Sequence, residues 1–348
     1  MRFGALRNTG VQAALASAVL FGASTPLAKL LLGEVSPWML AGLLYLGSGL
    51  GLGAYRLIRR PARVRIAARE RLPLLGAILS GGIIAPVLLM MGLSGMSASG
   101  ASLLLNLEGV FTAVLAWVVF RENVDRRVLL GMIAIVAGAV VLSWDGPASF
   151  ADAWPALAVI GACLAWGLDN NLTRKVALND ATWLAAVKGL VAGPVNLTLA
   201  FVLGATLPAA GVVIAAMGVG MLSYGVSLVL FILALRDLGT ARAGAYYSIA
   251  PFVGAAIAVA LGTPLTWQLG VAAVLMGVGV WLHLTERHEH EHTHEATTHD
   301  HWHTHDDGHH DHGHVPPVPA GTRHRHTHTH ERVTHIHRHY PDSHHQHH

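Results

Sequence analysis

Before its C-terminal end the chain contains no histidine and a single cysteine. All 24 histidines lie at or after His283, and Cys163 is the single cysteine, so an internal disulfide is excluded. Charged residues make up only 12% of the chain and hydrophobic residues make up 53%. The first 284 residues are too apolar for a soluble domain and have the composition of a membrane protein. We find no catalytic motif and do not expect an enzyme.

Hydrophobic runs of about 20 residues, the length that crosses a bilayer, recur along these residues. We predict an all-α integral membrane protein with ten transmembrane helices, in which the first run is a retained helix and not a cleaved signal. The predicted spans are 11–32, 37–58, 73–95, 97–120, 128–143, 155–173, 181–203, 209–235, 241–261 and 266–284.

Basic residues are distributed unevenly between the predicted loops. One set of alternate loops holds nearly all of them, whereas the other set holds Lys29 alone. The positive-inside rule places the basic loops in the cytoplasm, and with ten spans it places both termini there as well. The basic set comprises Arg56, Arg59, Arg60, Arg63, Arg65, Arg69, Arg71, Arg121, Arg126, Arg127, Arg174, Lys175, Arg236 and Arg242.

The sequence also contains a weak internal repeat. Residues 92–122 align without gaps to residues 233–263, with few identities but a shared pattern of small residues. We divide the chain into a first repeat, 1–147, a second repeat, 148–284, and a tail, 285–348. Five spans is an odd number, so the second repeat enters the membrane inverted relative to the first, and inverted repeats place a solute site at their interface near the midplane.

Three segments resemble the EamA family of the drug/metabolite transporter superfamily: "LFGASTPLAKLLLGEVSPWML", "FTAVLAWVVFRENVDRRVLLGMIAIVAGAVVL" and "LALRDLGTARAGAYYSIAPFVGAAIAVAL". The resemblance covers about residues 11–284 and leaves out the tail. It implies a multi-pass carrier of the bacterial inner membrane, commonly an exporter of amino acids, metabolites or other small solutes.

Three charged residues stand out because they lie far from the ends of predicted spans, where charges are costly and mark functional sites or ion pairs. Glu108 lies about 18 Å from the inner end of its span, close to the midplane. We interpret it as a proton or cation site, with a structural acid bonded to helix backbone or Asn106 as the alternative. Asp169 and Lys188 both lie about 7 to 11 Å deep on neighbouring spans. Equal depth favours an ion pair that fixes packing, and a substrate role for the pair is the alternative.

Weaker candidates surround these residues. Asn170 and Asn171 extend the polar patch beside Asp169 and can bind solute oxygens or cap an interrupted helix. Tyr246 opens the ninth span, where it can line a vestibule or anchor the helix at the interface.

In the tail, histidine often alternates with acidic residues. Few aliphatic residues are present, so we predict disorder. Imidazole and carboxylate donors suit zinc, nickel, cobalt or copper, although no cofactor is required for the function that we predict. The proposed ligands are His288, His290, His292, His294, His299, His301, His303, His305, His309, His310, His312 and His314.

These observations predict a secondary transporter that works by alternating access. Its solute is either a divalent transition metal (nickel, cobalt or zinc) or an amino acid or other small metabolite, with the proton as a candidate coupling ion. The alternative from another class is a membrane-anchored metal buffer or sensor. The expected partners are the lipid bilayer and the solute, a homodimer is left open, and no nucleic acid is expected.

Overall fold

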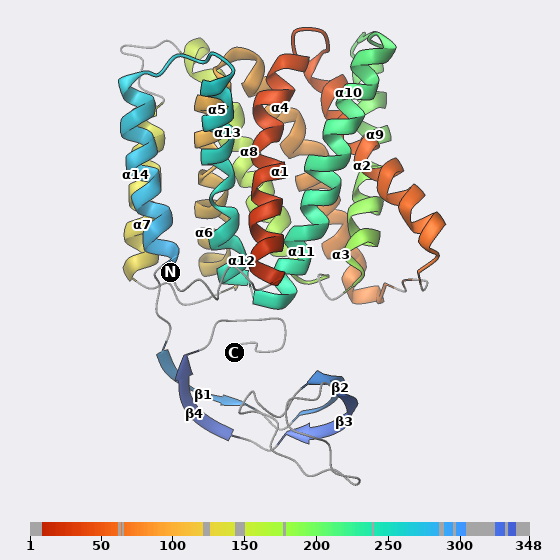
Figure 1. Ribbon diagram of the computed structural model, residues 1–348, viewed down its shortest axis with the longest axis vertical. Coiled ribbons are helices and arrows are strands. Elements are labelled where there is room, and N and C mark those ends of the chain that lie inside the picture. Colours follow the sequence, from red (N-terminus) through yellow and green to blue (C-terminus); the bar gives the residue numbers. More distant parts are fainter. Residues whose placement is uncertain are drawn as a thin grey trace. The chain divides into compact units, whose positions relative to one another are not determined.

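The computed structural model describes a helical body and four strand segments of the tail (Figure 1). The residues described are 9–61, 64, 66–120, 126–142, 150–176, 179–238, 240–284, 289–294, 297–303, 324–330 and 333–338. The chain divides into two compact units, a body that ends at Glu286 and a tail unit of Arg287–Tyr340, and we describe each by itself.

Helices occupy every range in which the sequence predicts a span. In the first half they are α1 (Thr9–Leu31), α2 (Pro37–Arg59), α3 (Ala68–Ala77), the π-helix η2 (Ile78–Ile84), α4 (Ala85–Gly95), α5 (Ala98–Leu104), α6 (Leu107–Phe120) and α7 (Arg126–Leu142). In the second half they are α8 (Phe150–Arg174), α9 (Ala181–Val202), α10 (Ala210–Gly220), the π-helix η3 (Met221–Val226), α11 (Ser227–Leu238), α12 (Thr240–Tyr247), α13 (Ala250–Ala260) and α14 (Trp267–Leu284).

The body is that of a helical membrane protein. Among the described residues, six helical segments are long and apolar enough to cross a bilayer: Thr9–Leu31, Pro37–Arg59, Ala68–Gly95, Ala98–Val119, Ala181–Val202 and Ala210–Ala234. Shorter apolar helices cover Leu129–Leu142, Ala250–Ala260 and Trp267–Leu282. The figure of ten crossings therefore stays a prediction.

Polar side chains fix where several helices begin. Ser36 precedes Pro37 and accepts a hydrogen bond from the Met39 N–H at 3.4 Å. Asp180 caps α9 by accepting from the Trp183 N–H at 2.8 Å, and Arg56 of α2 pairs with the same carboxylate at 2.6 Å. Partial burial alone raises the pKa of Asp180, but the hydrogen bonds and the guanidinium together hold it below its usual value.

The two halves share landmarks that define their correspondence. The π-helices begin at Ile78 and Met221, and the breaks between α5 and α6 and between α12 and α13 begin at Leu105 and Ser248, so both pairs lie 143 residues apart. The gapless alignment predicted from sequence pairs Glu108 with Ile249, whereas these landmarks pair it with Pro251. Other equivalent helices start 141 to 144 residues apart, so the offset between the halves varies along the repeat.

Contacts between helices follow this correspondence. The first helix of each half packs against the third and fourth segments of the other, α1 against α11 and α13, and α8 against α4 and α6. The equivalent helices α2 and α9 pack on each other, as do α7 and α14. At the α2–α9 crossing, a Cβ on Gly49 or on Gly189 would overlap the backbone of the opposite helix, so only glycine permits this approach.

The structure describes four short strands in the tail unit, and disorder of the tail as a whole stays a prediction. β1 (Glu289–His294) pairs antiparallel with β4 (Val333–Arg338), and β2 (Thr297–His303) pairs with β3 (His324–His330). Alternation of histidine with Thr, Glu or Arg is also a period of two, which suits a strand. The register sets histidine opposite histidine at 290 and 337, 292 and 335, 299 and 328, 301 and 326, and 303 and 324.

Candidate solute site

The third segment of the first half contains the π-helix η2, after which the backbone lacks a donor. Pro86 has no N–H to donate. An N–H at this position would bond to the Gly82 carbonyl in an α-helix or to the Gly81 carbonyl in a π-helix. Side chains supply the missing donors instead. The Tyr45 hydroxyl donates to the Gly81 carbonyl at 2.5 Å and Trp166 Nε1 donates to it at 3.1 Å. Asn196 donates to the Gly82 carbonyl at 3.1 Å.

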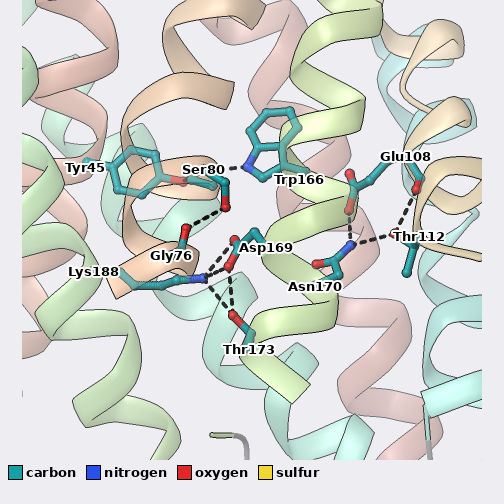
Figure 2. A network of polar contacts seen from close by, with 11 residues as sticks. Tyr45, Gly76, Ser80, Glu108, Thr112, Trp166, Asp169, Asn170, Thr173 and Lys188 are labelled. Carbon is teal, nitrogen blue, oxygen red and sulfur yellow. Dashed lines mark hydrogen bonds and ion pairs between the residues drawn. The ribbon is translucent and has the colours of Figure 1, made fainter. Parts of the chain in front are cut away.

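Asp169 and Lys188 form the ion pair that their equal depth predicts (Figure 2). Lys188 Nζ donates to Asp169 Oδ1 at 2.5 Å, to Oδ2 at 2.8 Å and to the Thr173 hydroxyl at 3.1 Å. The Thr173 hydroxyl donates to Asp169 Oδ1 at 2.8 Å. Gly81 closes the other side, because a Cβ there would overlap the Asp169 carboxylate. All three ammonium donors are used, so the buried pair is internally satisfied.

Glu108 has different surroundings. It lies in the first turn of α6, directly after the break at Leu105 and Asn106, where the helix dipole favours a carboxylate. Asn170 Nδ2 donates to Glu108 Oε1 at 2.8 Å and to the Thr112 hydroxyl at 3.2 Å. The Thr112 hydroxyl donates to the Glu108 carbonyl at 2.8 Å. Glu108 is only half-buried, and among the side chains that the structure describes no Lys or Arg pairs with it.

The other predicted residues are placed less centrally. Asn171 donates to the carbonyls of Gly167 and Thr112, at 2.8 and 3.1 Å, and so ties α8 to α6. Asn106 donates to the Leu103 carbonyl at 3.0 Å. The amide that donates to Glu108 is that of Asn170, which takes the role that the sequence suggested for Asn106. Tyr246 packs in a small separate cluster of alanines at the ends of α1, α11 and α12.

An aromatic cluster, which sequence reasoning missed, links the first helices of the two halves. The Phe21 ring lies 5.8 Å from Trp166, 5.8 Å from Tyr224 and 5.6 Å from Tyr247, between ring centroids. Tyr45 lies 5.2 Å from Tyr224. Trp166 precedes Asn170 by one helical turn, so the cluster adjoins the Glu108 group on α8. Tyr247, and not its neighbour Tyr246, joins this cluster. The sequence signal for a donor such as Tyr45 was Pro86, which lacks an N–H.

The potential metal ligands are distributed as follows. Among the described residues, no group of three or more His, Cys, Asp or Glu side chains is placed to hold a metal ion. Six of the proposed tail ligands lie on strands: His290, His292 and His294 on β1, and His299, His301 and His303 on β2. The others lie outside the described residues: His288, His305, His309, His310, His312 and His314.

Comparison with known proteins identifies both halves of the body. Residues 8–144 and residues 153–285 each match the model of the EamA-like transporter family. A protein from Methanothermobacter thermautotrophicus described as an uncharacterized transporter is 30% identical over 298 residues, which cover 79% of this chain and 86% of that protein. A protein of known crystal structure superposes with a TM-score of 0.62 at 18% identity, covering 79% of this chain and 96% of the other, and so supports the fold.

Proposed function

Because this chain belongs to the EamA-like transporter family, we propose that it is a secondary carrier that exports a small organic solute by alternating access. Its ten helical segments then form two inverted repeats of five spans, and the solute site lies where α6 and α8 meet. The exchange of helix contacts between the halves supports this arrangement, since rocking of one half against the other opens a shared interface to each side in turn.

One observation carries the location of the site. Glu108 is an intramembrane carboxylate at a helix break, held by a neutral amide and without a cationic partner among the described side chains. Broken helices at corresponding positions of two repeats mark the binding site in many carriers. A carboxylate of this kind can exchange a proton or the ammonium group of a solute, whereas Asp169 is already neutralised by Lys188.

The surrounding chemistry favours an organic solute with an amino group, such as an amino acid or amine, over a divalent metal. The Glu108 carboxylate is bonded to an amide, and the Glu108 backbone carbonyl is bonded to a hydroxyl. A dehydrated transition metal needs several imidazole, thiolate or carboxylate ligands instead. Metal cargo is the alternative, and the histidine-rich tail is the feature that favours it.

We place the protein in the bacterial inner membrane with both termini in the cytoplasm. The loop charges support this orientation, because the connections on one side of the predicted topology hold nearly all the Arg and Lys residues. The tail then lies in the cytoplasm, where its histidines bind zinc, nickel, cobalt or copper at neutral pH and release them as the pH falls through about 6.5.

The proposal is tested in cells that express the wild type, Glu108→Gln or a chain ending at Arg287. Amino acids and amines in the medium are measured by mass spectrometry, and cellular nickel, cobalt and zinc by elemental analysis. We expect at least one amine-bearing solute to accumulate outside wild-type cells, to fall to the empty-vector level with Glu108→Gln, and to persist without the tail. Glu70→Gln is the matched control, since Glu70 bonds only the backbone at the start of α3.

Two outcomes contradict this proposal and identify the alternatives. A rise in cellular metal with Glu108→Gln, with no change in organic solutes, would make metal the cargo. Loss of metal tolerance on removal of the tail, with no effect of Glu108→Gln on any solute, would indicate a membrane-anchored buffer.

A further inference from the structure

The connection from α2 to α3 concentrates positive charge at one end of the helical body. Arg56 is engaged by Asp180 at 2.6 Å, and the acid of this connection, Glu70, accepts from the Ala67 N–H at 3.0 Å. Within the part of the chain that the structure describes, the remaining guanidinium groups form no ion pair: Arg59, Arg60, Arg69 and Arg71. This surface therefore carries uncompensated positive charge.

An open pocket of about 450 Å³ lies beside this charge. Five of its lining residues present apolar or aromatic surface and the sixth is Arg71. The apolar lining consists of Val64, Ile66, Leu74, Leu75 and Trp183. Arg71 itself is exposed, so its guanidinium is available to a ligand in the pocket.

The pocket lies where a membrane span begins. Leu74 and Leu75 belong to α3, the opening part of the candidate span Ala68–Gly95, and Trp183 belongs to the first turn of α9. Leu75 is 60% exposed and Leu72 is 79% exposed, so apolar side chains face outward directly next to the arginines. At a bilayer boundary, an open apolar pocket of this kind faces lipid, and tryptophan is enriched at that level.

We propose that this pocket binds one anionic phospholipid, whose phosphate pairs with Arg71 and whose acyl chain lies along Leu75 and Trp183. The apolar lining matches an acyl chain, and the single pocket cation matches a phosphate. Arg71, the cation in the pocket lining, favours a headgroup with net negative charge over a zwitterionic one. This inference is independent of which solute the carrier moves.

The test uses the purified full-length protein in a mild, uncharged detergent. Phosphatidylglycerol and phosphatidylcholine with identical acyl chains are the probes, and native mass spectrometry measures bound lipid during titration. We expect one phosphatidylglycerol to bind in preference to phosphatidylcholine. Arg71→Gln should lower that preference about fivefold, the effect of about 1 kcal/mol for one basic residue near a charged lipid.

Two further variants decide between a pocket and diffuse charge. Arg69→Gln removes the same charge two residues away, outside the pocket lining, and should change the preference far less. Leu75→Trp fills the pocket from an exposed position and should displace both lipids while the protein stays folded, as judged by its melting temperature. Equal effects of Arg71→Gln and Arg69→Gln, or unchanged lipid binding with Leu75→Trp, would overturn the proposal.

Discussion

Glu108 of α6 and Asp169 of α8 have opposite surroundings. Asp169 is buried with Lys188 and Thr173, and every donor of the ammonium group is used. Glu108 is half-buried and is held by a neutral amide. A satisfied ion pair acts as a fixed part of the scaffold, whereas a carboxylate bonded only to an amide can change its charge or its partner. This contrast explains why we assign exchange to Glu108 and packing to Asp169.

The ion pair makes a clear prediction for stability. Lys188→Met leaves Asp169 as an uncompensated buried charge and should lower the free energy of unfolding by about 3 to 5 kcal/mol. Adding Asp169→Leu should restore most of this loss, because a buried pair often differs little from an apolar replacement. Thermal unfolding of the purified protein in detergent measures both. Arg56→Gln, at an ion pair whose members are partly exposed, is the control and should cost about 0 to 1 kcal/mol. A double variant less stable than Lys188→Met would contradict the prediction.

Sequence reasoning located these residues but not all of their partners. Depth along a span follows from residue count and helix rise, so the pairing of Asp169 with Lys188 was predictable. Whether Glu108 meets Asn106 or Asn170 depends on how α6 and α8 are rotated against each other, which hydropathy does not specify. For the same reason the sequence placed Tyr246 on the pathway, whereas Tyr247 contacts Phe21.

At the scale of elements, the π-helix η2 depends on donors from other helices. Tyr45 and Trp166 both donate to the Gly81 carbonyl, so each can substitute for the other. Tyr45→Phe or Trp166→Phe alone should cost little beyond packing. The double variant leaves a buried carbonyl without either donor and should lose about 1 to 3 kcal/mol more than the sum. A double-mutant cycle of thermal unfolding checks this, and strictly additive losses would contradict it.

Hydropathy predicted the helices well and their interruptions poorly. The bounds of α1, α2 and α9 lie within a few residues of the predicted spans, because bilayer thickness fixes the length of an apolar run. A π-segment or a two-residue break leaves the run apolar, so hydropathy does not reveal η3 or the break before α6, and the sequence signal of η2 is Pro86. In the tail, the alternation of histidine was read as a set of ligands, although the same period is that of a strand.

The strand register predicts how the tail binds metal. Directly opposed residues of antiparallel strands bring their Cβ atoms to about 4.5 to 5.5 Å, so opposed histidines offer two imidazoles together. Exchanging His324 with Arg325, His326 with Thr327 and His328 with Thr329 keeps the composition of β3 and removes this opposition. We expect the full-length protein to bind fewer nickel ions tightly, by calorimetric titration at pH 7.5, while total capacity is retained. Some tight sites should persist, because the exchanges leave the opposed histidines of β1 and β4 in place.

A control exchange tests whether order along the tail matters in general. Exchanging Gln346 with His347, beyond β4, should leave nickel binding unchanged. If the exchanges in β3 also leave the number of tight sites unchanged, the tail binds metal as an unpaired chain, and the paired register plays no part.

For the whole molecule, the central question is whether the second repeat is inverted. Gly33 follows α1 and Lys175 follows α8, so they occupy equivalent first connections of the two halves, and both are exposed. Inversion requires that they lie on opposite sides of the membrane. Cys163 is fully buried, and Cys163→Ala gives a background without thiols for introduced cysteines.

We predict that Gly33→Cys reacts with a membrane-impermeant maleimide on intact cells, and that Lys175→Cys reacts only after permeabilisation. Leu207→Cys, between α9 and α10, should behave like Gly33→Cys, because an extra span separates it from Lys175. The extent of labelling is measured by a gel shift of the full-length protein. Labelling of Gly33→Cys and Lys175→Cys from the same side would contradict inversion, and with it the shared interface on which alternating access depends.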